Sequence, residues 1–500
     1  MPFPTLSELA AKAVAEGILN DTLSLDYALD TKSSNTIVQK LLDSDGDKYK
    51  ILEVFKNKLN VTKIDFRRSM DCKIDAEGVR ILSNFNLDSL DFGDLSQLID
   101  KYPDNSSNND TLDIVFLLMR ALNNYSRRSL IHLGLPGDQE FIGGWEQEVS
   151  KIVPNLQSMD ISAAIFNERF QLSNLCISFP NLLVLDISLA DSLSTLHGIK
   201  NLEKLQKLSM CFVDFDDSDG YKELSELKNL KYLDVSGSDF SIRDMLAVRV
   251  RMEALEFLDC SITSVTEYEL EEFVKNHPSL RTIVAICTPC NTTASSGIKV
   301  LNAPSLNSMS ECLEYLFLTD RINMASNFMK DVFENLQSSP ENVGISELRQ
   351  IKNAVIFVLR ESVDPENNFW TAMWYLESGL FWYELSISLF SMDIFERINL
   401  FYNVFNANEM TEYQEEYVGL IFLMLGFLVN YMAPGILIPD RVLKFVIEKT
   451  VELVDEFQDY KPQGSQTISK AEKFMGRDQL QKIIGNSELM RKVQELLNIA

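Results

Sequence analysis

The sequence is poor in basic residues, in histidine and in long apolar runs. Its 500 residues include 46 Lys and Arg against 73 Asp and Glu, a formal net charge of −27, and only 3 His. Binding to a phosphate backbone needs clustered Lys and Arg, so this balance argues against a nucleic acid partner. The apolar run 418–429 is shorter than the roughly 20 residues that span a bilayer. We therefore expect a buried helix there and no membrane association.

Cysteine is also sparse, with 7 residues scattered along the chain. An odd, scattered set is typical of a reduced protein, so we expect a cytoplasmic or nuclear location or both. Cys287 and Cys290 form a lone C-x-x-C with no second pair, and no metal site is predicted from them. The start, MPFPTLSELA, has neither a basic segment nor an apolar run, so no signal peptide is expected.

Motifs of catalysis are missing as well. The chain has no G-x-x-x-x-G-K-S/T, no G-x-G-x-x-G, no H-E-x-x-H and no G-x-S-x-G. His132 and His197 have no Ser, Cys or carboxylate at a spacing that suggests a catalytic set. We therefore predict a non-catalytic protein without a cofactor.

What the chain does have is a repeated line of the form L-x-x-L-x-ϕ. It recurs at steps of about 25 residues, as in NLLVLDIS (181–188), NLKYLDVS (229–236) and ALEFLDCS (254–261), which is the signature of leucine-rich repeats. In each line the last two apolar residues alternate as in a strand and face a common core, while the residue between them faces solvent. Nine repeats are predicted, with leading residues Val61, Leu87, Leu130, Leu156, Leu182, Leu205, Leu230, Leu255 and Leu280.

The predicted fold is an α/β leucine-rich-repeat solenoid followed by an all-α armadillo- or HEAT-like domain, with a short helical N-terminal region. The N-terminal region covers 1–58, with helices at 5–19, 35–42 and 48–58. The repeats cover 59–290, with helices such as 266–278 between strand lines and a polar insertion at about 101–112. Long helical patterns, 438–457 among them, fill 300–460. The remainder, 461–500, is expected to be a flexible break at 461–470 followed by exposed, weakly packed helices.

The domain order and the wording of the repeats resemble the Zyg-eleven/Zer-one family, the leucine-rich-repeat substrate receptors of cullin-2 ubiquitin ligases. The lines 181–210, 227–240 and 252–286 carry the resemblance. It implies a substrate-recognition subunit that presents proteins for ubiquitination and proteasomal degradation. The alternative is a non-catalytic repeat scaffold that no longer engages the ligase.

The resemblance extends to the N-terminus, where Thr5–Val14 matches the family's elongin C-binding box S/T/P-L-x-x-x-C-x-x-x-A/V/L/I, with Ala in place of Cys. Such a box is a helix that places anchors at i, i+4 and i+8 in a partner's groove. The residues implied to bind elongin C, which acts with elongin B, are Leu6, Leu9, Ala10 and Val14. The cullin-2 box would follow without its usual Pro, and the residues implied there are Ser34, Ile37, Val38 and Leu41.

The family's armadillo-like part binds substrates that begin with glycine, through W-N-x-x-D on one helix and N-x-x-E on the next repeat. Trp374 and Asn403 match that pattern, while Tyr375 stands for Asn, Ser378 for Asp beside Glu377, and Asn406 for Glu. The resemblance thus implies a degron pocket, in which carboxylates and carbonyls would hold a free amino terminus. The other interpretation is that Trp374 is a core residue. The implied pocket residues are Trp374, Tyr375, Glu377, Ser378, Asn403 and Asn406.

Overall fold

The structure is a computed structural model in which residues 6–20, 22–44, 49–67, 73–98, 111–135, 140–166, 170–190, 193–215, 217–239, 241–290, 297–302, 311–312, 315–316, 319, 321, 440–485 and 487–498 are described. The chain divides into two compact units, Met1–Leu301 and Asn302–Ala500. The helical candidates predicted between 322 and 439, and with them the armadillo-like assignment, lie outside the described residues.

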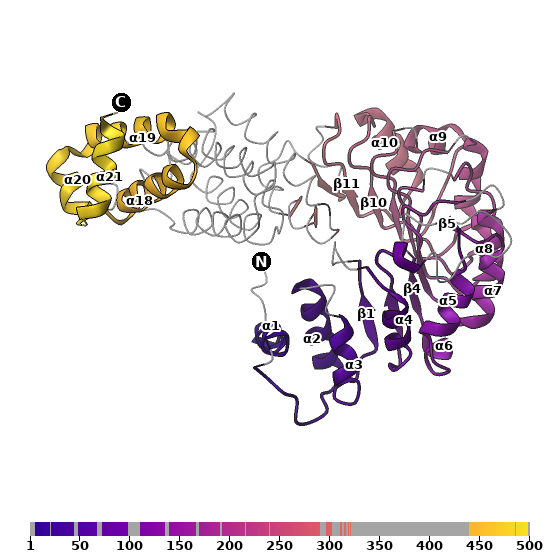
Figure 1. Cartoon of the computed structure of the whole chain (residues 1–500). Helices are drawn as coiled ribbons and strands as arrows, with labels where there is room; N and C mark the ends of the chain where they lie inside the picture. The colour runs from indigo at the N-terminus through magenta and orange to yellow at the C-terminus, as the bar shows by residue number, and fades with distance from the viewer. Residues whose placement is uncertain are drawn as a thin grey trace. The chain divides into compact units, whose positions relative to one another are not determined.

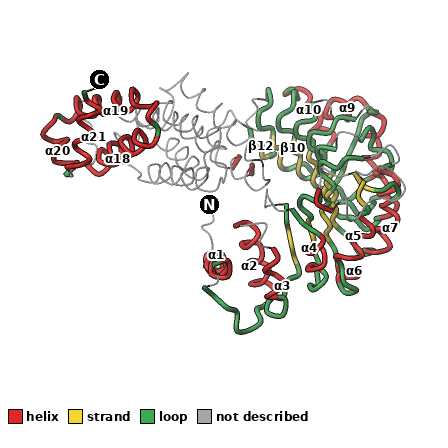
Figure 2. Tube along the Cα trace, viewed as in Figure 1, coloured by secondary structure: helices red, strands yellow, loops and turns green. Residues whose placement is uncertain are grey.

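The first unit is built on a 10-stranded parallel sheet in which successive repeats pair in order (Figures 1 and 2). Each strand is three residues long, and its middle residue is an apolar side chain that faces the helices. The nine predicted strand lines are confirmed. Their strands are β1 Lys63–Asp65, β2 Ser89–Asp91, β4 His132–Gly134, β6 Ser158–Asp160, β7 Val184–Asp186, β8 Lys207–Ser209, β9 Tyr232–Asp234, β10 Phe257–Asp259 and β11 Thr282–Val284.

A tenth strand, β12 (Lys299–Leu301), extends the sheet beyond the last predicted repeat. The segment GIKVL lacks the leading L-x-x-L, so the repeat pattern does not predict it. The predicted insertion falls mostly outside the described residues. Its last two residues form β3 (Thr111–Leu112), which pairs with β5 (Glu140–Phe141) in a separate small sheet.

Helices follow the strands and cover one face of the sheet, as the repeat pattern predicts (Figure 2). The predicted helix 266–278 is confirmed as α10 (Glu267–Asn276), which opens on a capping box between Thr266 and Glu269. The others are α4 Ala76–Leu82, α5 Ile114–Ala121, α6 Ser126–Ser129, α7 Trp145–Ile152, α8 Leu172–Ser178, α9 Ser241–Ala247 and the 3-10 helices η2 Ser96–Leu98, η3 Ile199–Asn201 and η4 Ser218–Glu226. The opposite face of the sheet is called the inner face below.

The N-terminal helices α1 (Leu6–Leu19), α2 (Thr31–Ser44) and α3 (Ile51–Phe55) share one hydrophobic core with the repeats, so residues 1–58 are part of the repeat unit. Helix α2 also closes the first strand edge. The Asn35 side-chain oxygen accepts hydrogen bonds from Thr62 N (2.9 Å) and Lys63 N (3.2 Å), as a neighbouring strand would. The edge therefore has a polar cap beside β1.

In the second unit the described helices are α18 (Asp440–Glu456), which confirms the predicted helix 438–457, α19 (Lys461–Met475), α20 (Arg477–Ile484) and α21 (Ser487–Leu497). The flexible break predicted at 461–470 is wrong. Pro462 lies in the first turn of α19, where a missing N–H costs nothing. Ile468 and Ala471 are buried, and Ser465 Oγ donates to Leu496 O at 2.7 Å, so α19 packs against α21. None of the described helices is long and apolar enough to cross a membrane.

Candidate interaction surfaces

Helix α1 packs on α2 through one face and leaves another at the surface. Ala11, Ala15 and Ile18 are buried, while Ala10 is exposed and Val14 is partly exposed. At 100° per residue, Ala10 and Val14 lie on the face next to the buried one. The described part of the predicted elongin C-binding box is therefore accessible. The side chains of Leu6 and Leu9 lie outside the described residues.

The four residues assigned to cullin binding lie in the core. Ser34, Ile37, Val38 and Leu41 are 0%, 4%, 1% and 3% exposed. Ser34 Oγ accepts a hydrogen bond from Asn60 N at 2.9 Å, at the entry to the first repeat. These side chains stabilise the join between α2 and the repeats, and this geometry does not support them as contact residues. The pattern of apolar residues that suggested an interface reflects core packing.

The six residues assigned to the degron pocket, Trp374, Tyr375, Glu377, Ser378, Asn403 and Asn406, lie outside the described residues, so their assignment stays a prediction.

A row of carboxylates follows the inner face, one residue after the buried middle residue of each strand. The register aligns it across neighbouring strands, and its members, here called the carboxylate row, are Asp65, Asp91, Asp160, Asp186, Asp234 and Asp259. Gly134 interrupts the row between Asp91 and Asp160, and Ser209 interrupts it between Asp186 and Asp234. The recurring Asp is visible in the sequence in lines such as L-D-ϕ-S. The leucine-rich-repeat signature by itself does not predict a function for it.

Most of these carboxylates also end their strand. Asp160 Oδ1 accepts from Ser162 N, Asp186 Oδ1 from Ser188 N, and Asp259 Oδ1 from Ser261 N, each at 2.9 Å. This Asx turn explains the D-ϕ-S sequence pattern. The short Asp side chain accepts a hydrogen bond from a backbone N–H that has no partner in the β-sheet. The second carboxylate oxygen remains for other contacts.

Arg67 compensates one half of the row. Its guanidinium pairs with Asp160 Oδ2 and donates to the carbonyl of Leu135, so the side chain reaches from the end of β1 to β6. Burial raises the pKa of Asp160, but the Arg67 guanidinium outweighs it, and the net pKa is lowered. Gly134 makes the room: a Cβ there would lie 2.0 Å from Asp91 Oδ1 and 3.3 Å from Arg67 Cζ.

Beside Arg67, His132 bridges two neighbouring strands. Its Nε2 lies 2.7 Å from Asp91 Oδ1 and its Nδ1 lies 2.8 Å from Ser158 Oγ. In the tautomer that serves both contacts, Ser158 donates to Nδ1. Ser158 N–H donates to Ile131 O, so it is not available to stabilise an oxyanion. The cluster supports a polar contact surface rather than acyl-transfer chemistry.

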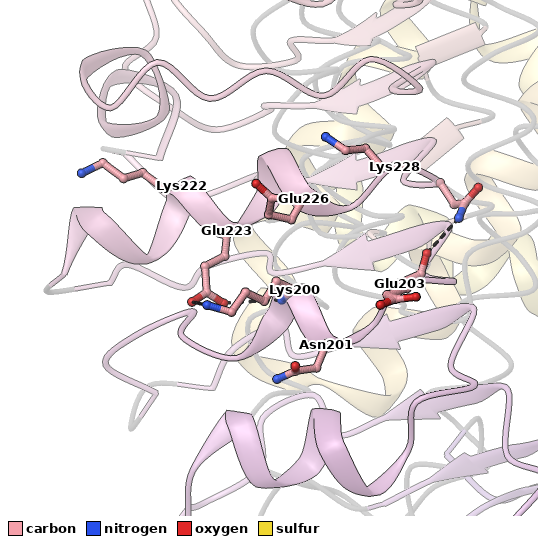
Figure 3. Close-up of a pocket in the computed structure, with 8 residues that line it drawn as sticks. Lys200, Asn201, Glu203, Lys222, Glu223, Glu226 and Lys228 are labelled. Carbon is pink, nitrogen blue, oxygen red and sulfur yellow. Dashed lines mark hydrogen bonds and ion pairs between the residues drawn. The ribbon is translucent and has the colours of Figure 1, made fainter.

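An open polar pocket of about 790 Å³ lies between η3 and η4 (Figure 3). Glu223 is its centre, accepting from Gly198 N at 2.8 Å and from Lys200 Nζ at 3.0 Å. Burial raises the pKa of Glu223, but the hydrogen bonds from Lys200, Gly198 and His197 together outweigh it, and the net pKa is lowered. Both carboxylate oxygens of Glu223 thus accept hydrogen bonds from the preceding repeat, and the pocket is a structural contact between the two repeats. Within the described residues no cluster of His, Cys, Asp or Glu is arranged to hold a metal.

No family model matches the chain. Gastrulation-defective protein 3 of Caenorhabditis elegans is 31% identical to it over 337 residues, which cover 65% of the chain and 46% of that protein. The chain thus spans less than half the length of this curated relative. The similarity is consistent with a diverged Zyg-eleven-like protein, and the resemblance predicted from the repeats is confirmed.

Two solved structures show a weaker likeness. A Listeria monocytogenes internalin is 14% identical, covers 60% of this chain and 97% of its own, and has a TM-score of 0.32. A chain from the Rad7 and Elc1 complex in yeast is 12% identical, with coverages of 59% and 92% and a TM-score of 0.29. At these TM-scores neither likeness carries an argument, and the strand ladder itself identifies the leucine-rich-repeat solenoid.

Proposed function

We propose that this diverged Zyg-eleven-like chain is a non-catalytic substrate-recognition subunit of a cullin-2 ubiquitin ligase. The observation that supports the proposal is that α1 has one buried face and an adjacent accessible face. Ala11, Ala15 and Ile18 fix the helix to α2. Ala10 is exposed, and Val14, which packs partly against the core, keeps part of its side chain at the surface, in the register of an elongin C-binding box. The partner at this face is elongin C, together with elongin B.

The rest of the assignment follows from that anchor. The repeats act as a rigid spacer, and the chain beyond them holds the substrate, including substrates that begin with glycine, near the ligase's catalytic end. Tethering raises the effective concentration of the substrate without any chemistry in this chain. The ligase acts in the cytoplasm, the nucleus or both.

The test is the affinity of the purified full-length chain for the elongin B–C complex, measured by calorimetry. Ala10→Glu places a charge in the groove contact, and we expect affinity to fall by about tenfold or more. Lys12→Glu is the matched control, because residue 12 is exposed and lies on the opposite side of α1 from residue 10. Loss in both variants would point to charge alone.

Ala10→Cys gives a second, opposite test. Cys is larger than Ala and restores the family's residue, so we expect affinity to rise by about threefold through additional apolar burial. If neither the native chain nor Ala10→Cys binds elongin B–C, the ligase assignment fails and the repeat-scaffold alternative stands.

A cullin-2 contact, if α2 makes it, uses the solvent side of that helix. Lys32 is exposed and Thr36 is half-buried, in contrast to Val38 in the core. Thr36→Arg should weaken cullin-2 recruitment in a pulldown and leave elongin binding unchanged. Val38→Ala should instead lower thermal stability, since it opens a cavity. Equal recruitment by Thr36→Arg and the native chain would remove α2 from the interface.

A further inference from the structure

A small pocket lies between two neighbouring repeats, where the segment before α7 meets the segment after β6. A backbone bridge between Glu140 and Ile165 holds the two segments together. The pocket has a volume of about 10 Å³, which is room for one water-sized group. Gly143, Gly144 and Ile165 line it and are exposed, so the pocket opens to solvent on their side.

Aromatic rings form the wall of this pocket. The rings of Phe141 and Trp145 lie 5.8 Å apart between their centres, at an angle of 61°. Trp145 and Phe170 lie 6.5 Å apart and nearly parallel, and Phe166 stacks on Phe170 at 3.8 Å. The face of an aromatic ring attracts a cation that lies within about 6 Å of the ring centre. A pocket lined by several rings therefore favours a cation over a neutral group of the same size.

The same pocket is lined by a buried carboxylate. Glu146 is 1% exposed, and its Oε2 accepts no hydrogen bond from the described residues. Burial raises the pKa of Glu146, and among the described residues no Lys, Arg or His offsets this effect. A buried carboxylate without a partner destabilises a fold, because it loses its hydration and gains nothing in return.

Helix α7 itself does not need this carboxylate to be buried. An acid in the first turn of a helix interacts favourably with the helix dipole, and Glu148 already does so from an exposed position in the same turn. Trp145 and Val149 supply buried apolar contacts for the helix. Neither the helix dipole nor core packing therefore accounts for a buried carboxylate at residue 146.

We propose that this pocket, here called the aromatic pocket, binds the ammonium group of a lysine side chain from a partner protein. The ammonium donates a hydrogen bond to Glu146 Oε2 and faces the aromatic rings. The alkyl chain of the lysine leaves the pocket on the side of Gly144 and Ile165. The aromatic pocket lies on the repeats and not on α1, so this binding does not depend on the ligase assignment.

Charge and size together select a primary ammonium group. A buried water needs two to four polar partners, whereas among the described residues the aromatic pocket is lined by one charged side chain, Glu146, and otherwise by aromatic rings, Ile165 and glycine. A primary ammonium is about as large as a water. A trimethylammonium or a guanidinium group is larger and does not fit a volume of about 10 Å³.

The probe is Nα-acetyl-lysine N-methylamide, and its affinity for the full-length chain is measured by ligand-observed NMR. We expect it to bind at least tenfold more tightly than the derivative with a hydroxyl in place of the ammonium. The Nε-trimethyl derivative and glycine N-methylamide, which presents a free amino terminus, should each bind at least tenfold more weakly than the probe. Equal affinity for the ammonium and hydroxyl derivatives would mean that the pocket holds water only, and it would overturn the proposal.

Two matched variants locate the binding. Glu146→Gln keeps the shape of the side chain and removes its charge, so the preference for the ammonium derivative should disappear. Glu148→Gln removes an exposed acid from the same helix turn and should leave that preference unchanged. Loss of the preference in both variants would show general charge attraction and contradict a specific site.

A lysine placed at the mouth of the pocket gives a test that does not rely on a weak ligand. Ile165 is 51% exposed and lines the pocket, so Ile165→Lys brings an ammonium to Glu146 from within the chain. We expect binding of the probe to be lost and the melting temperature to rise by about 2 °C. Ile165→Met, which adds no charge, should do neither. A rise that persists when Glu146→Gln is added would show that the new lysine acts elsewhere, and the proposal would fail.

Discussion

The two halves of the carboxylate row share one backbone and differ in one cation. Around Gly134 the Arg67 guanidinium lies between carboxylates, and the pKa of Asp160 is lowered although burial opposes it. Around Ser209, Asp186 is held by Ser188 N–H, and burial together with Asp160 raises its pKa to about 6. The difference shows that a strand register places acids in a row without regard to their charge. A cation must then come from elsewhere in the chain or from a partner.

Removal of the cation should have the largest effect. Arg67→Met removes the cation that pairs with Asp160, while Asp91 keeps its contact with His132, and we expect a loss of about 2–3 kcal/mol in the free energy of unfolding. This loss is smaller than for a fully buried ion pair because the Arg67 side chain is 23% exposed. Urea denaturation of the full-length chain, followed by circular dichroism, measures it.

Two controls bound that prediction. Lys151→Met breaks a surface pair with Glu148 whose side chains are 68% and 53% exposed, and it should cost no more than about 0.5 kcal/mol. Asp160→Asn added to Arg67→Met should recover part of the loss, since the buried negative charge goes with its partner. A simple sum of the two single effects would mean that Arg67 does not act through Asp160.

Closing the gap tests the geometry rather than the charge. Gly134→Ala brings a Cβ to 2.0 Å from Asp91 Oδ1, so the carboxylate and then the guanidinium must move. We expect a loss of about 1–2 kcal/mol, measured by the same urea titration. Gly144→Ala is no match for this test, because its φ is 76°. Ser209→Ala in the other half of the row adds no atoms and removes only the hydroxyl that pairs with Ser188 Oγ at 2.9 Å, so it should cost less, about 0.5–1 kcal/mol. Equal losses at both positions would contradict a special role for Gly134.

Whether the sequence predicts a strand or a side-chain contact depends on how far apart along the chain the residues that determine it lie. The nine strands are predicted because each line carries its own L-x-x-L. The contact of His132 with Ser158 was within reach, since 26 residues is one repeat and parallel strands in register bring such residues together. A search for catalytic motifs misses this contact, because it compares spacing along the chain and not position within the repeat. Arg67 was out of reach, because its place depends on a gap at Gly134 two strands away.

The errors at the two ends of the chain have a common cause. Ile37, Val38 and Leu41 read as an interface because an apolar stripe on a helix looks the same whether a partner or the chain's own repeats cover it. Residues 461–470 read as a linker because Pro, Gly and Ser dominate their first half. The buried residues Ile468 and Ala471, which pack α19 against its neighbours, follow residues 461–465. Local composition describes a segment, and burial depends on its neighbours.

The smallest effect is expected beside Ser209, where Asp186→Asn should stabilise the fold. The folded pKa of Asp186 is about 6, above the roughly 3.9 of an unfolded Asp, so ionisation costs stability as pH rises through this window. The Asn oxygen can still accept from Ser188 N–H. We expect a gain of about 1 kcal/mol at pH 8, a value reduced from the full shift because the side chain is half-buried. The gain should shrink toward pH 4.5 in urea titrations at both pH values. An equal gain at pH 8 and pH 4.5 would mean that the ionised Asp186 carboxylate costs no stability. Its charge would then be as well compensated as that of Asp160, which pairs with Arg67.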